Sequence, residues 1–441
     1  MPEPTRARGA ILRKDLTAMK NEIFEPTWES VKTHALPEWY DDCKLGIFIH
    51  WGLYSVPAWA EVTWELGGEP SAEDWHRHNP YAEWYLNTIR IQDSPARKHH
   101  DETYGKDFPY ERFVEKFTCD KWNPAEWAKL FKEAGAGYVV LTTKHHDGFC
   151  LFPSKYTDYN AMNLGPRRDL LGDLTGAVRA EGLKMGTYFS GLFDWTTFDR
   201  PRLRHTNEDN YNHTYAFSDY SYNQALELVD RYKPSVLWND IGWPEKGRMD
   251  LPHLFAHYYN TVPEGVIDDR WDVDFCDYTT AEYLHGKRTL DKKWEMCRGL
   301  GLSFGYNQNE GDETVISGRN LVRILVDYVS HNGNLLINVG PRADGTIPEI
   351  QVDRLKKLGA WLKVHGEAIY ATRPWLERQQ DALPGGATAF YTRKGRDLYA
   401  IVDGLAAGTS SVTLPITDAA LPVDVVDEYP IHVKLQGFFQ N

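Results

Sequence analysis

The sequence predicts an α/β protein, a (β/α)8-like TIM barrel followed by a small C-terminal β-sandwich domain. Three observations carry this prediction. Short apolar segments alternate with segments of helical periodicity over most of the 441 residues. Polar residues follow these apolar segments, one after another, at the point where each segment ends. Beyond about residue 372 the pattern changes to short alternating strands split by glycines and turn residues, as in a hairpin or sandwich.

Most of the predicted strands are preceded by a helix. A typical helix is NPAEWAKLFKEAG, where Asn123 is the N-cap, Pro124 takes the first position and Gly135 closes the last turn. Strands that alternate with helices form a parallel sheet, because right-handed crossovers place the helices on its faces. The predicted strands are 45–52, 138–148, 184–191, 235–240, 266–271, 275–282, 302–309 and 334–341. The predicted helices are 123–135, 167–183, 220–234, 250–265, 317–333 and 349–370.

The residues that end the strands favour a barrel over its rival, a doubly wound open sheet. No GxGxxG motif follows the first strand, as the open dinucleotide-binding sheet would require. In barrels the active site lies at the C-terminal ends of the strands. Chemically useful residues stand there in strand after strand: His50, the run from Lys144 to Asp147, Tyr188, the run from Trp238 to Asp240, the run from Asp268 to Arg270, Glu282 and Asn307.

Three regions are expected along the chain. Residues 1–24 form an N-terminal extension, residues 25–372 the catalytic barrel, and residues 373–441 the C-terminal β-sandwich-like domain. The last region is small for an independent hydrophobic core, so we expect it to pack on the barrel. A short sheet also leaves edges uncovered, which predicts a homo-oligomer in which a neighbouring subunit covers them.

Composition narrows the classes of partner. The net charge of −14 argues against nucleic acid and against an anionic membrane surface. No apolar run approaches the ~20 residues of a membrane span, and the N-terminus lacks the apolar core of a signal peptide. The 5 cysteines are scattered, which fits reduced thiols in a cytoplasmic protein. The 16 Trp and 25 Tyr favour a carbohydrate partner, because flat side chains with a polar tip stack on sugar rings.

Two carboxyl groups flanking the scissile bond are the requirement for glycoside hydrolysis. Asp240 is the first candidate, because it ends a buried strand two residues after Trp238, which would wall the pocket. The alternative is that Asp240 caps the next helix. Spacing does not choose its partner. The candidates near strand ends are Asp147, Asp268, Asp269, Asp277, Glu282 and Glu310, and Glu83 and Trp84 lie in a long aromatic insertion that either covers a pocket or packs as a flap.

The adjacent pair His145 and His146, followed by Asp147, leaves three interpretations open. The first is a metal site, which makes a metal-dependent barrel hydrolase using this His-His-Asp cluster the alternative function. Consecutive strand residues point to opposite faces, however, and none of the predicted strands carries the HxH that would place two imidazoles on one face. The second is a pair of structural histidines hydrogen-bonded in the wall. The third, which we favour, is a pair that binds substrate hydroxyls.

Several segments resemble the retaining α-L-fucosidases of glycoside hydrolase family 29. They are GIFIHWGLYSVPAW, AEWY, YVVLTTKHHDGFCLF, GPRRDLLGDL, VLWNDIGWPEKG, EYLHGK, GLSFGYNQNE and NLLINVGPRADGTIP. The resemblance runs in order from about residue 25 to about residue 372. It is greatest to the compact bacterial members that carry a C-terminal β-sandwich.

This resemblance implies an exo-acting retaining α-L-fucosidase that works by double displacement and needs neither cofactor nor metal. Its partner would be a fucosylated oligosaccharide or glycoconjugate, with hydrolysis and fucosyl transfer both open. By the match to LWND, Asp240 would be the nucleophile, and Glu282 matches the acid/base position of the bacterial members. The matched substrate-binding residues are His50, Trp75, Glu83, Trp84, His145, His146, Tyr188, Trp238, Arg270 and Phe304.

Overall fold

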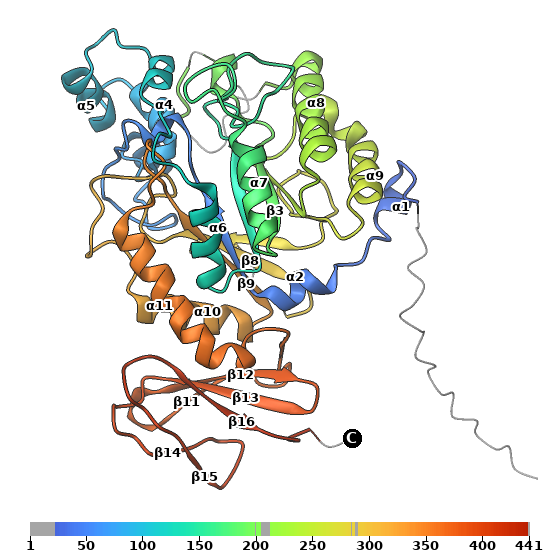
Figure 1. Cartoon of the computed structure of the whole chain (residues 1–441), viewed down its shortest axis with the longest axis vertical. Helices are drawn as coiled ribbons and strands as arrows, with labels where there is room; N and C mark the ends of the chain where they lie inside the picture. Colours follow the sequence, from blue (N-terminus) through green and yellow to red (C-terminus); the bar gives the residue numbers. More distant parts are fainter. Residues whose placement is uncertain (1–22, 199, 204–211, 284, 287–289, 440–441) are drawn as a thin grey trace, which may run out of the picture.

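The computed structural model describes residues 23–198, 200–203, 212–283, 285–286 and 290–439. The predicted N-terminal extension, residues 1–24, therefore lies almost wholly outside the described residues. The rest of the chain forms a curled, mainly parallel sheet covered by helices, with an antiparallel sheet packed below it (Figure 1). The predicted fold class, a barrel-like α/β domain followed by a small C-terminal β domain, is confirmed.

The barrel-like sheet has nine strands in the order β5-β4-β3-β2-β1-β9-β8-β6-β7. Neighbouring strands are parallel throughout, except that β7 is antiparallel to β6. The strands are β1 (Leu45–Ile49), β2 (Tyr138–Lys144), β3 (Lys184–Ser190), β4 (Val236–Asp240), β5 (Val266–Ile267), β6 (Thr279–Glu282), β7 (His285–Gly286), β8 (Trp294–Gly299) and β9 (Gly333–Val339). Within the described residues no ladder closes the sheet between β5 and β6, where Asp277 N donates to Ile267 O at 3.0 Å.

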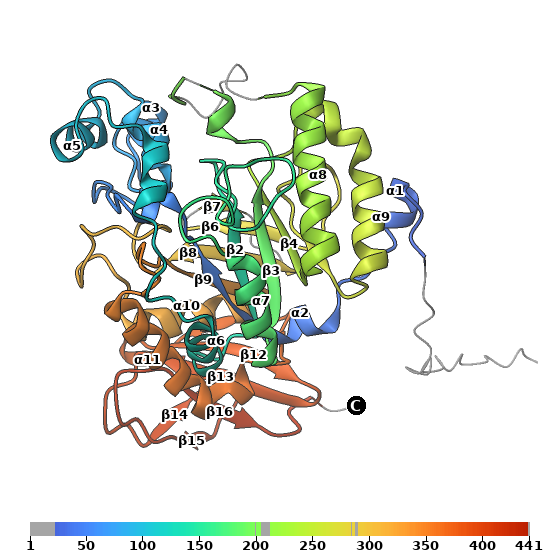
Figure 2. The same cartoon turned by 45° about the horizontal axis from the view of Figure 1, so that its top comes forward.

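Helices follow most of the strands and cover the outside of the sheet (Figures 1 and 2). They are α6 (Pro124–Glu133), α7 (Leu170–Ala180), α8 (Tyr215–Tyr232), α9 (Leu251–Thr261), α10 (Gly318–Ser330) and α11 (Glu349–His365). As predicted, the Asn123 side chain caps α6 by accepting from Ala125 N and Glu126 N. None of the helices in the described part of the chain is long and apolar enough to cross a membrane.

A long insertion between β1 and α6 gathers at one end of the barrel. It contains α3 (Ala72–Arg77), the 3-10 turn η2 (Ala82–Trp84), α4 (Tyr85–Ile89) and α5 (Pro95–Thr103). In Figure 2 these helices lie together at the end where the strands of the sheet finish. The aromatic residues of the insertion are therefore placed above the C-terminal ends of the strands.

One predicted strand is wrong. Residues 302–309 form turns, and the place in the sheet belongs to β8 at 294–299. The sequence WEMCRG lacks a clear strand pattern because Glu295 is a buried carboxylate. It accepts from Tyr40 OH at 2.8 Å, from Trp238 Nε1 at 3.0 Å and from Tyr138 OH. Three donors from other parts of the chain satisfy this side chain and allow an acidic residue inside the sheet.

The C-terminal residues form a five-stranded antiparallel sheet and a two-stranded one. The first contains β10 (Arg373–Pro374), β11 (Gln380–Ala382), β12 (Thr388–Lys394), β13 (Asp397–Asp403) and β16 (Ile431–Leu435), and the second pairs β14 (Ser411–Thr413) with β15 (Ala420–Pro422). Alternate residues face opposite sides. Phe390 and Ile401 pack into the barrel core, whereas Tyr391 and Val402 pack into a separate small core. Figure 1 shows the sheet lying beneath α10 and α11.

Candidate active site

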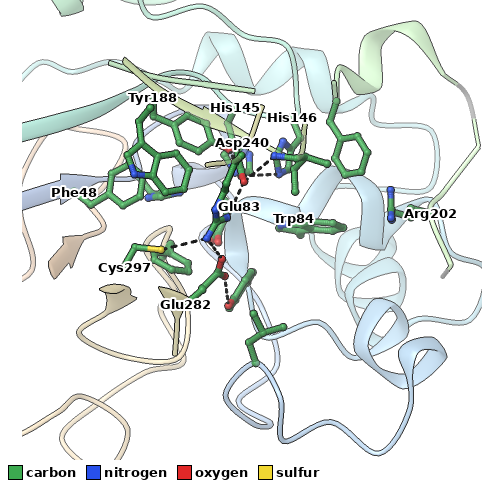
Figure 3. Close-up of a pocket in the computed structure, with 18 of the residues that line it drawn as sticks. Phe48, Glu83, Trp84, His145, His146, Tyr188, Arg202, Asp240, Glu282 and Cys297 are labelled. Carbon is green, nitrogen blue, oxygen red and sulfur yellow. Dashed lines mark hydrogen bonds and ion pairs between the residues drawn. The ribbon is translucent and has the colours of Figure 1, made fainter. Parts of the chain in front are cut away.

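A cavity of about 210 Å³ lies at the C-terminal ends of the parallel strands (Figure 3). This volume is below the ~300 Å³ that marks the lower limit for drug-sized ligands, so it suits one small ring. Every site residue that the resemblance implied lines this cavity: His50, Trp75, Glu83, Trp84, His145, His146, Tyr188, Trp238, Asp240, Arg270, Glu282 and Phe304.

Arg270 holds two carboxylates that come from different strands. Asp240 is the last residue of β4, Glu282 is the last residue of β6, and Arg270 follows β5. The Nη1 group of Arg270 donates to Asp240 Oδ1 at 2.8 Å, and its Nη2 group donates to Glu282 Oε2 at 3.0 Å. The guanidinium lies over the ring of Trp238, 4.6 Å from its centroid. One planar cation thus fixes the relative position of both carboxyl groups.

Asp240 is held in its ionised form. Burial alone would raise its pKa, but the charge of Arg270, helped by a hydrogen bond from Tyr188 OH at 2.7 Å, outweighs burial and holds the pKa of Asp240 below its usual value. The backbone N–H of Ile241 also donates to Oδ1, at 2.9 Å. A buried carboxylate that stays ionised at neutral pH can act as a nucleophile or a base.

Glu282 is distinguished from the other acidic candidates by its position. It accepts from Tyr81 OH at 2.9 Å as well as from Arg270. The remaining acids have structural partners and do not line the cavity. Asp147 accepts from Tyr110 OH, Asp268 from Asn239 N, Asp269 from Thr280 N, Asp277 from Tyr259 OH, and Glu310 from Leu302 N and Ser303 N. Besides Asp240 and Glu282, Glu83 is the further carboxyl group that the cavity's described lining contains.

Glu83 is a buried carboxyl group that stays neutral near pH 7. It lies in η2, and its Oε2 accepts from Gly305 N at 2.7 Å. Burial raises its pKa to about 8 and outweighs this hydrogen bond. A neutral carboxyl group can donate to an oxygen of a ligand, whereas Asp240 can only accept.

Three imidazoles form one side of the cavity. The register of β2 against β3 shifts between Thr142 and Lys144, and β2 ends at Lys144, so His145 and His146 escape the alternation of a regular strand. Both therefore line the cavity with His50. Burial lowers the pKa of His50 to about 4 and that of His146 to about 3, so both rings are neutral.

Asp147 does not complete a metal site with the two histidines. Its carboxylate accepts from Tyr110 OH at 2.8 Å, and it is absent from the cavity lining. In the part of the chain that the structure describes, no group of three or more His, Cys, Asp or Glu side chains is arranged to hold a metal ion. The geometry of the histidine pair favours contacts with a ligand inside the cavity.

Seven further residues of the cavity lining were not predicted from the sequence. The missed lining residues are Phe48, Leu66, Tyr81, Phe193, Arg202, Ile241 and Cys297. Two of them could have been predicted from the sequence. Strand alternation places Phe48 on the same face as His50, and Tyr81 lies two residues before Glu83. Cys297 lies in the misplaced strand β8, where its Sγ lies 3.6 Å from Arg270 Nη2. Arg202 lies in the connection after β3, and no pattern in the sequence indicated it.

Lys144, the lysine of the KHHD motif, faces away from the cavity into a buried ion pair. Its ammonium lies 3.5 Å from Asp194 Oδ2 and donates to Gln224 Oε1 at 3.2 Å, with both charged side chains fully buried. Asp194 caps the 3-10 turn η4 (Trp195–Thr197) by accepting from Thr196 N at 3.0 Å. At Gly148, directly after the motif, φ is +76° and a Cβ would lie 2.5 Å from Asp194 Oδ1, so this glycine leaves room for the carboxylate.

The ion pair positions the wall beside the nucleophile candidate. Trp195 N, in the turn capped by Asp194, donates to the carbonyl of His146 at 2.7 Å. The rings of Trp195 and His146 lie 5.2 Å apart, edge to face. His146 Nε2 is in turn 3.8 Å from Asp240 Oδ2. Lys144 therefore helps to position His146 indirectly, through Asp194 and Trp195.

We expect Lys144→Met to lower the melting temperature strongly, because it leaves Asp194 buried without its cation. Breaking one partner of a buried ion pair typically costs ~3–5 kcal/mol. The double variant Lys144→Met/Asp194→Asn removes both charges and keeps the acceptor for Thr196, so it should recover most of the loss. Differential scanning calorimetry measures both.

The matched control is Lys129→Met, which breaks a pair with Glu133 at 3.9 Å in which the two side chains are 69% and 46% exposed. We expect no measurable change in melting temperature there. If the double variant melts no higher than Lys144→Met, the buried pair does not act as a unit.

Comparison with known proteins places this geometry in a family. The family model described as alpha-L-fucosidase matches residues 11–367. The alpha-L-fucosidase of Dictyostelium discoideum is 36% identical over 376 residues, covering 82% of this chain and 77% of that protein. The tissue alpha-L-fucosidase of Rattus norvegicus is 34% identical over 390 residues, covering 86% of this chain and 78% of that protein.

Solved structures agree in fold and in sequence. The crystal structure of Thermotoga maritima alpha-fucosidase superposes with a TM-score of 0.80 at 49% identity, over 88% of this chain and 90% of that one. The same enzyme in complex with fucose gives a TM-score of 0.81 at 47% identity, over 93% and 96%. A Thermotoga maritima alpha-L-fucosynthase in complex with α-L-Fuc-(1-2)-β-L-Fuc-N3 gives 0.83 at 48%, over 93% and 95%. This chain belongs to the α-L-fucosidase family.

Proposed function

We propose that this chain is an exo-acting retaining α-L-fucosidase, which removes terminal α-L-fucosyl residues from fucosylated oligosaccharides or glycoconjugates. The observation that carries the proposal is the pair of carboxyl groups, those of Asp240 and Glu282, held by the single guanidinium of Arg270 in a cavity sized for one ring. A cavity of this size accepts the end of a chain and not its interior, which supports exo action.

The reaction would proceed in two displacements, with Asp240 as the nucleophile. Its carboxylate attacks the anomeric carbon of fucose, and the bond from that carbon to the leaving oxygen breaks while Glu282 gives its proton to that oxygen. A covalent fucosyl-enzyme ester results. Glu282 then takes a proton from a water molecule, which attacks the same carbon and releases Asp240, so two inversions give net retention. Arg270 keeps both carboxyl groups in place through both steps.

The remaining residues of the cavity would bind the sugar by complementary chemistry. The hydroxyls meet His50, His145, His146 and the neutral carboxyl group of Glu83. Fucose is a deoxy sugar, so its methyl group needs an apolar patch, which Trp75 and Phe304 supply. Trp84, Trp238 and Tyr188 enclose the ring and keep water away from the reacting carbon.

Fucosyl transfer is a second use of the same intermediate. An acceptor hydroxyl that replaces water in the second displacement receives the fucose with retained configuration. The Thermotoga maritima fucosynthase bound to a disaccharide azide, at 48% identity to this chain, supports this extension. We therefore propose that hydrolysis and transfer share one site and differ in the acceptor alone.

The test of the nucleophile is Asp240→Gly assayed on p-nitrophenyl α-L-fucoside with and without azide. We expect a loss of at least ~10³-fold in kcat, because no carboxylate remains to form the ester. Azide fits the space that the carboxylate leaves, attacks the anomeric carbon and restores release of the phenol. The product is then β-L-fucosyl azide, which NMR identifies.

Asp274→Gly is the control, because Asp274 is an exposed aspartate in the segment after Arg270. It should keep wild-type activity and show no response to azide. If Asp240→Gly retains most of the activity, Asp240 is not the nucleophile. If the wild type cleaves another glycoside but not this one, the protein is a glycosidase whose substrate sugar is not fucose.

The test of the acid/base is the dependence of Glu282→Ala on the leaving group. A p-nitrophenolate leaves without a proton, so its release in the first step should fall little. A sugar leaving group needs the proton, so its cleavage should fall by ~10²–10⁴-fold. Glu83→Gln gives the comparison, since a residue that binds the sugar should affect both substrates alike. Equal losses on both substrates in Glu282→Ala would contradict the assignment.

We further propose that the chain divides at residue 372 into a barrel, residues 25–372, and a C-terminal domain. The five free cysteines support a reducing compartment such as the cytoplasm. The strand β16 forms an edge of the C-terminal sheet, which supports a homo-oligomer that covers it. A monomer by light scattering would remove the oligomer from this proposal.

A further inference from the structure

Two of the histidines that line the cavity are each backed by a short hydrogen-bond relay. Each relay runs from the ring Nδ1 through one polar side chain to a backbone carbonyl. A carbonyl oxygen carries no proton and can only accept, so each relay has one possible direction. The direction decides which nitrogen of each neutral ring holds the proton, and therefore what the ring offers to a ligand.

Behind His146 the relay passes through Ser190, the last residue of β3. Ser190 Oγ lies 2.7 Å from the carbonyl oxygen of Phe193, and only the serine has a proton to place between these two oxygens. The hydroxyl proton of Ser190 therefore lies in the hydrogen bond to Phe193 O. Ser190 Oγ also lies 2.7 Å from His146 Nδ1, so the proton of this second bond must come from the imidazole. His146 is protonated at Nδ1.

Behind His50 the relay passes through Asn338 of β9. Asn338 Nδ2 donates to the carbonyl oxygen of Phe304 at 2.6 Å, which fixes the orientation of the amide. The amide oxygen, Oδ1, then faces His50 Nδ1 at 2.7 Å and can only accept. His50 must donate, so it too is protonated at Nδ1.

We propose that Ser190 and Asn338 are positioning residues that fix His146 and His50 as Nδ1–H tautomers, so that both present a bare Nε2 to the sugar. The two rings then accept protons from substrate hydroxyls and donate none. The spacing of His146 agrees: its Nε2 lies 3.8 Å from Asp240 Oδ2, longer than the ~2.7–2.9 Å expected if a proton joined them. A hydroxyl near both can donate to one of them.

This inference takes the identity of the ligand, fucose, from the proposed function. It adds that the cavity prefers a ligand with a hydroxyl group facing each of the two rings. Nε2 of either ring left without a hydroxyl proton becomes a buried, unpaired acceptor. The cavity should therefore discriminate against sugars in which the matching hydroxyl is replaced by hydrogen or by fluorine. His145 has no such relay: among the described residues its Nδ1 has no hydrogen-bond partner, so its tautomer is not fixed in this way.

Nuclear magnetic resonance of the ligand-free, full-length protein tests the tautomers directly. With ¹⁵N-labelled histidine, long-range ¹H–¹⁵N correlations distinguish ring nitrogens that carry a proton from those that do not. The signals of the two rings are assigned by their loss in His50→Gln and His146→Gln. We expect a protonated Nδ1 and a bare Nε2 in both rings. A protonated Nε2 in either ring overturns the proposal.

Ser190→Ala tests whether the relay sets the tautomer of His146. Without the hydroxyl, the ring should populate both tautomers, and the His146 correlations should shift accordingly. Ser221→Ala is the matched control, because the buried Ser221 hydroxyl also donates to a carbonyl, that of Gly191 at 3.1 Å. It should leave the His146 signals unchanged. An unchanged His146 tautomer in Ser190→Ala contradicts the role of the relay.

Calorimetric binding of L-fucose and its analogues separates this inference from the proposed function. At two of the hydroxyl positions, the deoxy analogue should bind roughly 5- to 100-fold more weakly, with the fluoro analogue no tighter than the deoxy one. Fluoro analogues that bind as well as L-fucose at every position contradict the inference while leaving the fucosidase intact. Nδ1–H tautomers in a protein that binds no fucose contradict the proposed function alone.

Discussion

The contact of Arg270 with both Asp240 and Glu282 is the interaction on which the rest of the site depends. Two carboxyl groups brought close together repel each other when ionised, and a fixed cation between them removes that cost. The cation also supports the ionised state of Asp240, against burial that would otherwise raise its pKa. Its own position is set by the ring of Trp238 beneath it. The geometry of the two carboxyl groups therefore depends on the guanidinium of Arg270 and on the Trp238 ring that it stacks on.

The barrel-like sheet supplies this contact from segments far apart in the chain. Because the strands are parallel, the residues that end β4 and β6 meet at one edge, and Arg270 enters from the connection after β5. A layer of buried polar residues supports them from below and behind. Glu295 accepts from Trp238 Nε1, and the ion pair of Lys144 with Asp194 holds the wall behind His146. The residues that line the cavity are thus positioned by Glu295, Lys144 and Asp194, which do not line it.

Much of this arrangement could be predicted from local patterns. Strand ends such as that of Asp240 were visible because an apolar run stops at a polar residue. The choice of Glu282 among several acids could not be made from spacing, since it depends on which carboxyl group reaches Arg270. The strand β8 was missed because Glu295 interrupts its apolar pattern, and its partners, Tyr40, Tyr138 and Trp238, lie on other elements. Relays such as that of His50, which joins His50, Asn338 and Phe304, become visible only when three segments are seen together.

Trapping the covalent intermediate tests most directly whether Asp240 is the nucleophile. The protein is incubated with 2-deoxy-2-fluoro-L-fucosyl fluoride, whose fluorine at carbon 2 slows the second displacement, and the trapped species is digested and sequenced by mass spectrometry. We expect one fluorofucosyl group per chain, attached to Asp240, with activity recovered as the label is released. A label on Glu83 or Glu282, or turnover with no covalent adduct and an inverted product, would contradict it.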